Sequence, residues 1–282
     1  MNTFRPLFDP IFQWMQGLRT PLRRAPSTVQ PVTTAAALAG PEVAEFEAPG
    51  GRGHRFEPTV ERELDADLRT LASGLPGASE GLLGVVEFQG PRGVPDLLVM
   101  TRGTAALRRR LQYGVPFIES AADCAVVATL NIKRPLTSRD VASATGMTVE
   151  QVERRLRALT HIGIVVAHGQ HGYSRRADLE PIGRTYAFEA KVSDWRRGLD
   201  QALRYSAWCD ASSLVLLRAP SDMSGLIERC NHLDIGLAVR DQWVRRPRLG
   251  RPQRALRLAA SERLAQQVSC LELEPFAPGV GV

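Results

Sequence analysis

Several patterns are scarce in this chain, and each scarcity excludes a class of protein. Its 282 residues contain four cysteines, none of them in a CxxC pair, which argues against a zinc ribbon or a disulfide framework and favours reduced thiols in a cytoplasmic protein. No run of about 18 apolar residues occurs, which excludes a spanning helix. The N-terminal segment interrupts its apolar residues with Arg5, Pro6, Asp9 and Pro10, unlike a secretory signal. The sequence has no P-loop, no GxGxxG and no Ser/His/Asp order that would support another chemistry.

Lysine is also scarce. Of the 36 basic residues only Lys133 and Lys191 are lysines, and the other 34 are arginines. The formal net charge of +6 and the pI of about 9.6 favour an anionic partner, with DNA first. The preference for arginine can equally reflect a GC-rich genome. With 44% hydrophobic residues, the chain can bury one large core or two ordinary ones.

The order of the expected elements divides the chain into three parts. Residues 1–55 are interpreted as an N-terminal arm and a linker, because 20–55 are rich in Pro, Ala, Thr and Gly. Residues 56–117 and 177–282 together predict one α/β domain with a mixed sheet flanked by helices. Between them, residues 118–176 predict a separate, mostly helical insert. We therefore expect a sheet whose strands come from both sides of an insertion.

The insert has the pattern of a winged helix-turn-helix. Helices are expected over 121–131, 137–145 and 148–162, followed by two short strands around a Gly-rich tip. Thr137-x-x-Asp140 and Thr148-x-x-Gln151 have the spacing of capping boxes, which marks the start of the second and third helices. Such a module predicts binding in a DNA groove.

Three charged residues stand in otherwise apolar β-type segments of the α/β domain. Asp96 lies in GVPDLLVM, and Glu189 and Lys191 lie two residues apart in AFEAKV. Side chains alternate across a strand, so Glu189 and Lys191 share a face. Buried charges need partners, and two carboxylates on neighbouring strands suit Mg²⁺ or Mn²⁺. A lysine beside them can position water or stabilise charge on a phosphate, as phosphodiester hydrolysis requires.

Pro95-Asp96 followed by Glu189-x-Lys191 resembles the PD-(D/E)xK, restriction-endonuclease-like nucleases. Gln201-x-x-x-Tyr205 in the next helix is similar to the Q-x-x-x-Y of their RecB-like branch. The resemblance implies a restriction-endonuclease-like fold, a metal held by Asp96 and Glu189, and site roles for Lys191, Gln201 and Tyr205. The family often adds a helical Glu, for which Glu61 is the best placed, followed by Glu63.

Basic residues supply the expected DNA contacts. In the insert we expect Arg154, Arg157 and His161 to lie opposite the apolar face of the third helix. The tip of the wing is expected to add Arg175 and Arg176, together with His168 and His171. On the helix after Glu189-x-Lys191, a second stripe is expected to grip phosphates and to stack a base. Its members are Arg197, Gln201, Arg204 and Trp208.

Other interpretations remain open. Glu189 and Lys191 can be an edge-strand ion pair, Asp96 a turn residue, and the basic helix faces merely solvated. His168 and His171 favour a polar loop over a metal site. The leading functional hypothesis is a Mg²⁺-dependent DNA nuclease, in repair or in defence against foreign DNA. The alternatives are a DNA-binding transcriptional regulator whose inactive nuclease-like domain serves for homodimerisation, and a protein-interaction scaffold. No membrane partner is expected.

Overall fold

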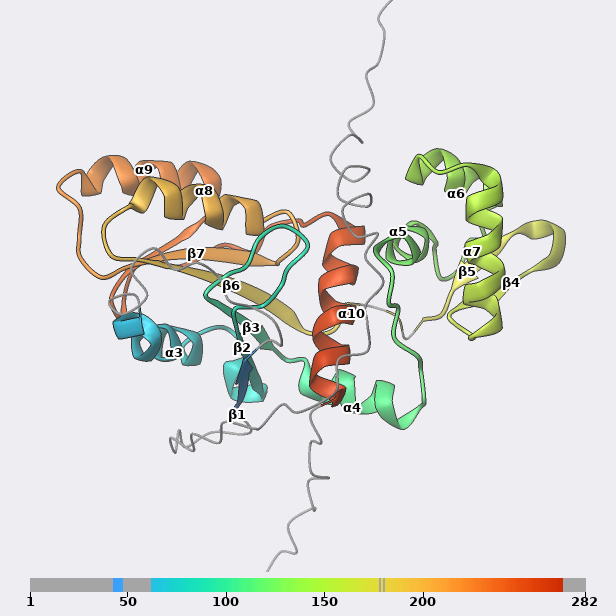
Figure 1. Ribbon diagram of the computed structural model, residues 1–282, viewed down its shortest axis with the longest axis horizontal. Helices are drawn as coiled ribbons and strands as arrows, with labels where there is room; N and C mark the ends of the chain where they lie inside the picture. The colour runs from blue at the N-terminus through green and yellow to red at the C-terminus, as the bar shows by residue number, and fades with distance from the viewer. Residues whose placement is uncertain (1–42, 48–61, 178, 180, 271–282) are drawn as a thin grey trace, which may run out of the picture.

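The protein consists of two lobes on either side of a long helix, α10 (Arg254–Cys270) (Figure 1). The computed structural model describes residues 43–47, 62–177, 179 and 181–270. The larger lobe is a mixed sheet flanked by helices, as the sequence predicts. The smaller lobe contains three helices and a two-stranded sheet.

The sheet of the larger lobe joins strands from both sides of the insertion. Its strands, in spatial order, are β1 (Val43–Glu47), β2 (Leu82–Val86), β3 (Leu97–Thr101), β6 (Arg184–Lys191), β7 (Ala211–Leu216), β8 (Gly236–Val239) and β9 (Gln242–Arg245). Strand β3 precedes the insert and β6 follows it, and the two pair antiparallel. Strands β6, β7 and β8 run parallel, whereas β9 returns antiparallel. The expectation of one sheet built from two separate parts of the chain is confirmed.

Strand β1 corrects the interpretation of residues 20–55 as a linker. Residues 43–47 pair in parallel with β2, from Val43 opposite Leu82 to Glu47 opposite Val86. From Ala44 to Glu47 the strand alternates apolar and acidic residues, which suits a sheet strand. The Pro- and Gly-rich composition around it concealed this short alternation.

Helices cover the two faces of the sheet. The helix α3 (Asp65–Ser73), with the short 3₁₀ turns Arg62–Leu64 and Ala78–Glu80 at its ends, lies on one face. The helices α8 (Trp195–Tyr205) and α9 (Met223–Leu233) lie on the other (Figure 1). Alternation along β6 serves both layers, because Phe188 and Ala190 join the α3 cluster while Ala187 joins the opposite core.

The smaller lobe follows the expected order of elements. Its helices are α5 (Ala121–Thr129), α6 (Ser138–Thr145) and α7 (Val149–His161), and β4 (Val165–Ala167) pairs with β5 (Tyr173–Arg175) around a 3₁₀ tip, Gly169–His171. Both predicted capping boxes are present, at Thr137 and Thr148. The turn between α6 and α7 uses Gly146 at φ +71°, a left-handed conformation that favours glycine.

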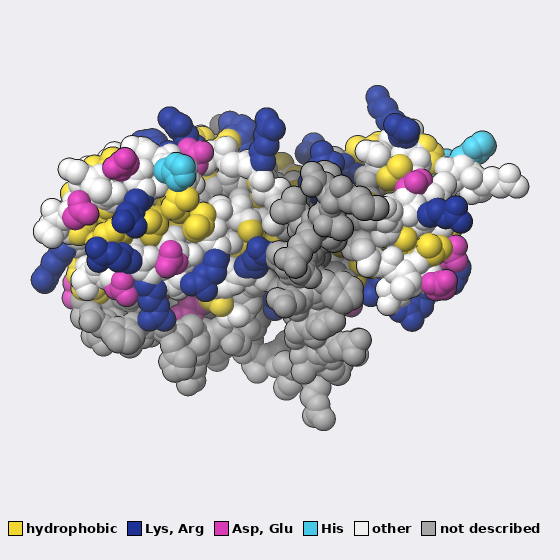
Figure 2. Space-filling view, turned by 90° about the horizontal axis from the view of Figure 1, so that it is seen from above, with side chains coloured by type: hydrophobic (Ala, Val, Ile, Leu, Met, Phe, Trp, Pro, Cys, Tyr) yellow, Lys and Arg dark blue, Asp and Glu magenta, His cyan; other side chains and the backbone are white. Residues whose placement is uncertain are grey.

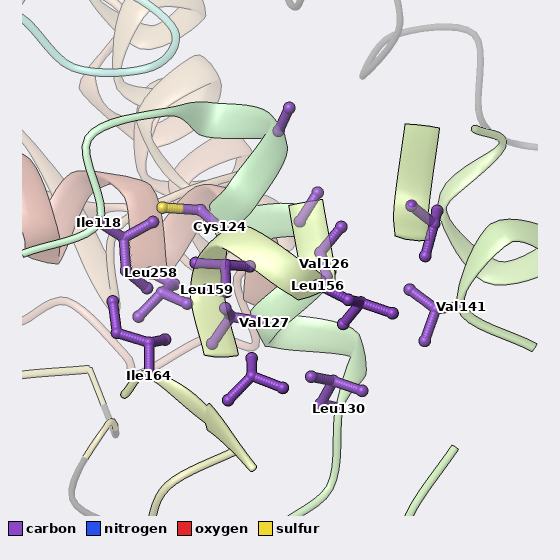
Figure 3. Close-up of a cluster of buried hydrophobic side chains, with 14 of the residues drawn as sticks. Ile118, Cys124, Val126, Val127, Leu130, Val141, Leu156, Leu159, Ile164 and Leu258 are labelled. Atoms are coloured by element: carbon purple, nitrogen blue, oxygen red, sulfur yellow. The ribbon is translucent and has the colours of Figure 1, made fainter. Parts of the chain in front are cut away.

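Helix α10 completes the cores of both lobes. Leu258 packs with Leu156, Ile164 and other residues of the smaller lobe (Figure 3). Leu256 and Leu264, on other faces of the same helix, pack against the larger lobe. Arg110 of α4 (Thr104–Gln112) forms a buried ion pair with Glu262, whose Oε2 also accepts a 2.8 Å hydrogen bond from the Ile118 amide.

Polar contacts elsewhere on α10 fix the helix to the larger lobe. Ser261 Oγ accepts a 2.8 Å hydrogen bond from the Ile182 amide, and Arg257 is bonded to the Gly183 carbonyl and to Asp210. Most of the helix is therefore buried between the lobes, although Arg263 is exposed. Within the described part of the chain, no helix is both long and apolar enough to cross a bilayer.

Candidate active site

Strands β3 and β6 bring Asp96, Glu189 and Lys191 together. Leu97 pairs with Phe188, so Asp96, one residue before β3, stands opposite Glu189 although the two are 93 positions apart in the chain. Directly opposite residues of an antiparallel pair share a face, and so do Glu189 and Lys191 along one strand. All three residues are buried, with exposed fractions of 8%, 1% and 9% respectively.

Short hydrogen bonds fix the three side chains. Asp96 Oδ2 accepts a 2.7 Å hydrogen bond from the Ala190 amide. Lys191 Nζ lies 2.7 Å from Glu189 Oε1 and donates to the Ala190 carbonyl at 3.0 Å. The pairing satisfies the buried ammonium, which would otherwise be costly to desolvate.

Tyr205, the last residue of α8, holds the second oxygen of Glu189. Its hydroxyl lies 2.6 Å from Glu189 Oε2 and 2.9 Å from the Val94 carbonyl oxygen. A phenol carries one proton, so it donates to one of these acceptors at a time. Both carboxylate oxygens of Glu189 therefore have partners, one from the strand and one from the helix.

The electrostatic environment raises the pKa of Glu189. Burial raises its pKa, the negative charge of Asp96 raises it further, and the Lys191 ammonium and the Tyr205 hydroxyl oppose this, leaving a pKa of about 7. Burial and the neighbouring Glu189 also raise the pKa of Tyr205, which keeps the phenol neutral as a donor. A carboxyl group that titrates near neutral pH is a feature of functional sites.

Gly198 lets α8 lie directly on the lysine. A Cβ at this position would stand 2.8 Å from Lys191 Cγ and 2.6 Å from Leu214 Cδ1, closer than side chains tolerate. Gly198 is not among the site residues predicted from the sequence. The available signal was the lone glycine inside the helical segment WRRGLDQALRY. Glycine weakens a helix, so its presence in a helix interior suggests that close packing requires it.

Trp208 corrects the expectation of a base-stacking side chain. It is fully buried, with its ring centroid 5.9 Å from that of Phe88, and its Nε1 donates to the Arg92 carbonyl at 3.2 Å. Helix α8 ends at Tyr205, so the helical spacing used to place Trp208 no longer applies. The ring instead supports the β2–β3 loop, where a Cβ on Gly90 would collide with it at 2.4 Å.

The chemistry of the donor set fits a hard divalent cation. Asp96 and Glu189 offer carboxylate oxygens whose mutual repulsion raises the pKa of Glu189, and a cation between them would relieve it. Gln201, one turn before Tyr205 on α8, has a buried Oε1 without a hydrogen-bond partner among the described residues. The described residues contain no group of three or more His, Cys, Asp or Glu side chains placed to hold a metal. Glu61 lies outside them, and Glu63 belongs to the 3₁₀ turn before α3.

The expected DNA-binding residues occupy different environments. Arg154, Arg157 and His161 are exposed on α7, opposite its buried Val152, Leu156 and Leu159. Arg197 and Arg204 are exposed on α8.

Arg175 and Arg176 are not at the tip of the wing. They are half-buried, and their guanidinium groups donate to the carbonyls of Leu179 at 2.9 Å and Gly163 at 3.3 Å. Strand β5 ends at Arg175, so both arginines lie at the base of the hairpin, and their hydrogen bonds fix that base. The tip carries His171, and His168 directly precedes the tip, with its Nε2 2.8 Å from Ser174 Oγ.

Comparison of the chain with protein-family models, with curated proteins and with solved structures finds no match.

Proposed function

We propose that the protein is a metal-dependent nuclease that hydrolyses phosphodiester bonds in DNA. In this proposal the larger lobe is a restriction-endonuclease-like domain of the PD-(D/E)xK type. The observation that carries it is the convergence of Asp96, Glu189 and Lys191 on one face of β3 and β6, from positions far apart in the chain. Tyr205 contacts Glu189 from α8, which ties the Q-x-x-x-Y pattern to the same place.

The residues divide the chemistry among them. Asp96 and Glu189 would hold Mg²⁺ or Mn²⁺, which when bound supplies Lewis-acid stabilisation of charge on the phosphate. Lys191 carries an ammonium that can orient a water and stabilise negative charge on the phosphate oxygens. Tyr205 restrains the Glu189 carboxyl from the side of α8, and Gly198 allows the stem of Lys191 to pack closely under that helix.

The smaller lobe is proposed to be a winged helix-turn-helix that binds DNA. The capped helices α6 and α7, the glycine turn between them and the β4–β5 hairpin support this interpretation. The polar face of α7 presents Arg154, Arg157 and His161 to solvent, and arginine both grips phosphates and reads guanine edges.

A specific observation favours a second candidate function. Both oxygens of Glu189 are already paired, and its side chain is only 2% exposed, as in a structural ion pair. The protein would then be a DNA-binding regulator or scaffold with an inactive nuclease-like lobe.

Incubation of the full chain with supercoiled, linear and single-stranded DNA, with Mg²⁺, Mn²⁺ or EDTA, separates these candidates. We expect cleavage only with the metal, and a loss on the order of 10²-fold or more in Asp96→Asn, which retains an oxygen to accept the Ala190 amide. Asp200→Asn, at an exposed position of α8, is the matched control. DNA binding without cleavage under any metal condition would favour the regulator or scaffold.

A further inference from the structure

A strongly basic cleft lies between the two lobes, and neither Asp96 nor Glu189 lines it. Its volume is about 740 Å³, which is within the range of ligand sites. One wall is the segment after α5, with Lys133 and Arg134, and the other is the start of α10, with Arg254 and Arg257. Arg175 of β5 also lines it, and the described lining contains five cationic side chains and no acidic one.

The start of α10 reverses the usual placement of charge on a helix. The N-terminal end of a helix carries partial positive charge, which favours acidic side chains in the first turn. Helix α10 has no acidic residue there and begins with Arg254, followed one turn later by Arg257. Cations at this end repel the helix dipole and one another, so a bound anion would stabilise the arrangement.

Arg257 provides an independent sign of a missing partner. Its side chain is 5% exposed, and its Nε donates to Asp210 Oδ2 at 3.0 Å while Nη2 donates to the Gly183 carbonyl at 2.9 Å. Its Nη1 is buried without a hydrogen-bond partner among the described residues. A buried guanidinium nitrogen left unpaired is costly, and this residue lines the cleft. Two of its nitrogens therefore hold the guanidinium in place, while the third is buried in a cleft-lining residue without an acceptor among the described residues.

We propose that this cleft binds backbone phosphates of a nucleic-acid strand that passes between the lobes. Arg257 and the start of α10 form the fixed part of the site, and Lys133, Arg134 and Arg254 are exposed cations around it. Figure 2 shows dark-blue Lys and Arg side chains on both lobes, as a strand that crosses from one to the other would require. The proposal rests on the proposed function in taking DNA as the source of the phosphates.

The test measures binding of the full chain to fluorescein-labelled single-stranded and duplex DNA in EDTA, over a range of salt concentrations. Lys133→Glu/Arg134→Glu changes only exposed side chains, so the melting temperature should not fall. We expect affinity to drop by about tenfold or more, and the slope of log K against log salt to fall by about one per lost phosphate contact. Arg254→Glu, on the opposite wall, should give a loss in the same direction.

Arg109→Glu/Arg248→Glu is the charge-matched control, because both residues are exposed and neither lines the cleft. Unchanged DNA affinity in the cleft variants, or an equal loss in the control, would overturn the proposal. Calorimetry with pyrophosphate distinguishes the source of the anion. The variants could lose pyrophosphate binding and keep their DNA affinity. This result would overturn the proposal that a nucleic-acid strand binds here, and would assign the cleft to a free anion. Failure of the nuclease proposal is separate, because it shows as absent cleavage while these binding differences persist.

Discussion

The charged residues proposed to act in catalysis and those proposed to bind DNA lie in opposite environments in the two lobes. In the larger lobe Asp96, Glu189 and Lys191 are buried and bonded to one another or to the backbone. In the smaller lobe Arg154, Arg157 and His161 are exposed on one helix face. Buried charges are coupled to stability and to pKa, whereas exposed charges act mainly through long-range attraction. Substitutions should therefore change chemistry and stability in the first lobe and binding alone in the second.

The largest expected effect comes from Lys191→Met, which keeps most of the stem that packs against Gly198 and removes the ammonium. Cleavage should fall on the order of 10²–10⁴-fold, because the group is proposed to act on water and on phosphate charge. DNA affinity in EDTA should remain nearly unchanged. Single-turnover cleavage and anisotropy measure the two. Unchanged turnover in the folded variant would remove Lys191 from the mechanism, and an equal loss of binding would break the contrast between the lobes.

The pH dependence of stability sharpens the same contrast. The pKa of Glu189 is about 7 in the folded protein against 4.5 as its ordinary value, so the folded state holds this proton more tightly. Its contribution to stability is complete below pH 4.5 and is lost as the pH rises to about 7, by about 3 kcal/mol.

Urea unfolding in EDTA, from pH 5 to 8, measures this loss as the pH-dependent difference between the parent and Glu189→Gln. Glu228→Gln, at an exposed site of α9, serves as the control and should follow the parent at every pH. If the Glu189→Gln difference is independent of pH, the carboxyl does not titrate in this range.

Gly198→Ala tests the packing of α8 on the lysine. Alanine alone would favour the helix by about 1 kcal/mol, but its Cβ would press on Lys191 and Leu214. We expect a net loss of about 1–3 kcal/mol in the free energy of unfolding, with reduced cleavage. Asp200→Ala, exposed on the same helix, is a helix-favouring change without the close contacts and should not lower stability. A variant more stable than the parent would show that the helix can move away at little cost.

The smallest effect is expected in the smaller lobe. Arg154→Ala/Arg157→Ala should weaken DNA binding roughly tenfold and reduce the salt slope by about one per phosphate contact, with an unchanged melting temperature. Arg155→Ala is the matched control, because this neighbour is half-buried and bonded at 2.8 Å to Asp123. It should lower stability instead. A double variant that binds every duplex like the parent would mean that α7 does not face DNA.

Local signals in the sequence predicted much of this architecture. The capping boxes at Thr137 and Thr148 fixed the starts of α6 and α7, and period-two alternation placed Glu189 and Lys191 on one face. The predictions that failed depended on contacts distant in the chain. Trp208 packs against Phe88, and Arg176 donates a hydrogen bond to the Gly163 carbonyl. Residue spacing within a helix or a hairpin does not predict either contact. The role of Gly198 likewise depends on how closely α8 approaches β6 and β7.

Helix α10 has a consequence for how the protein is made. It follows both lobes in the chain, yet Leu258 completes the core of one and Leu264 that of the other. On the ribosome, neither core can close until these residues have left the exit tunnel, so the growing chain keeps apolar surfaces open on both lobes. Such exposure favours association with chaperones and aggregation over early domain-by-domain folding. The two lobes are therefore expected to mature together, late in synthesis, as one cooperative unit.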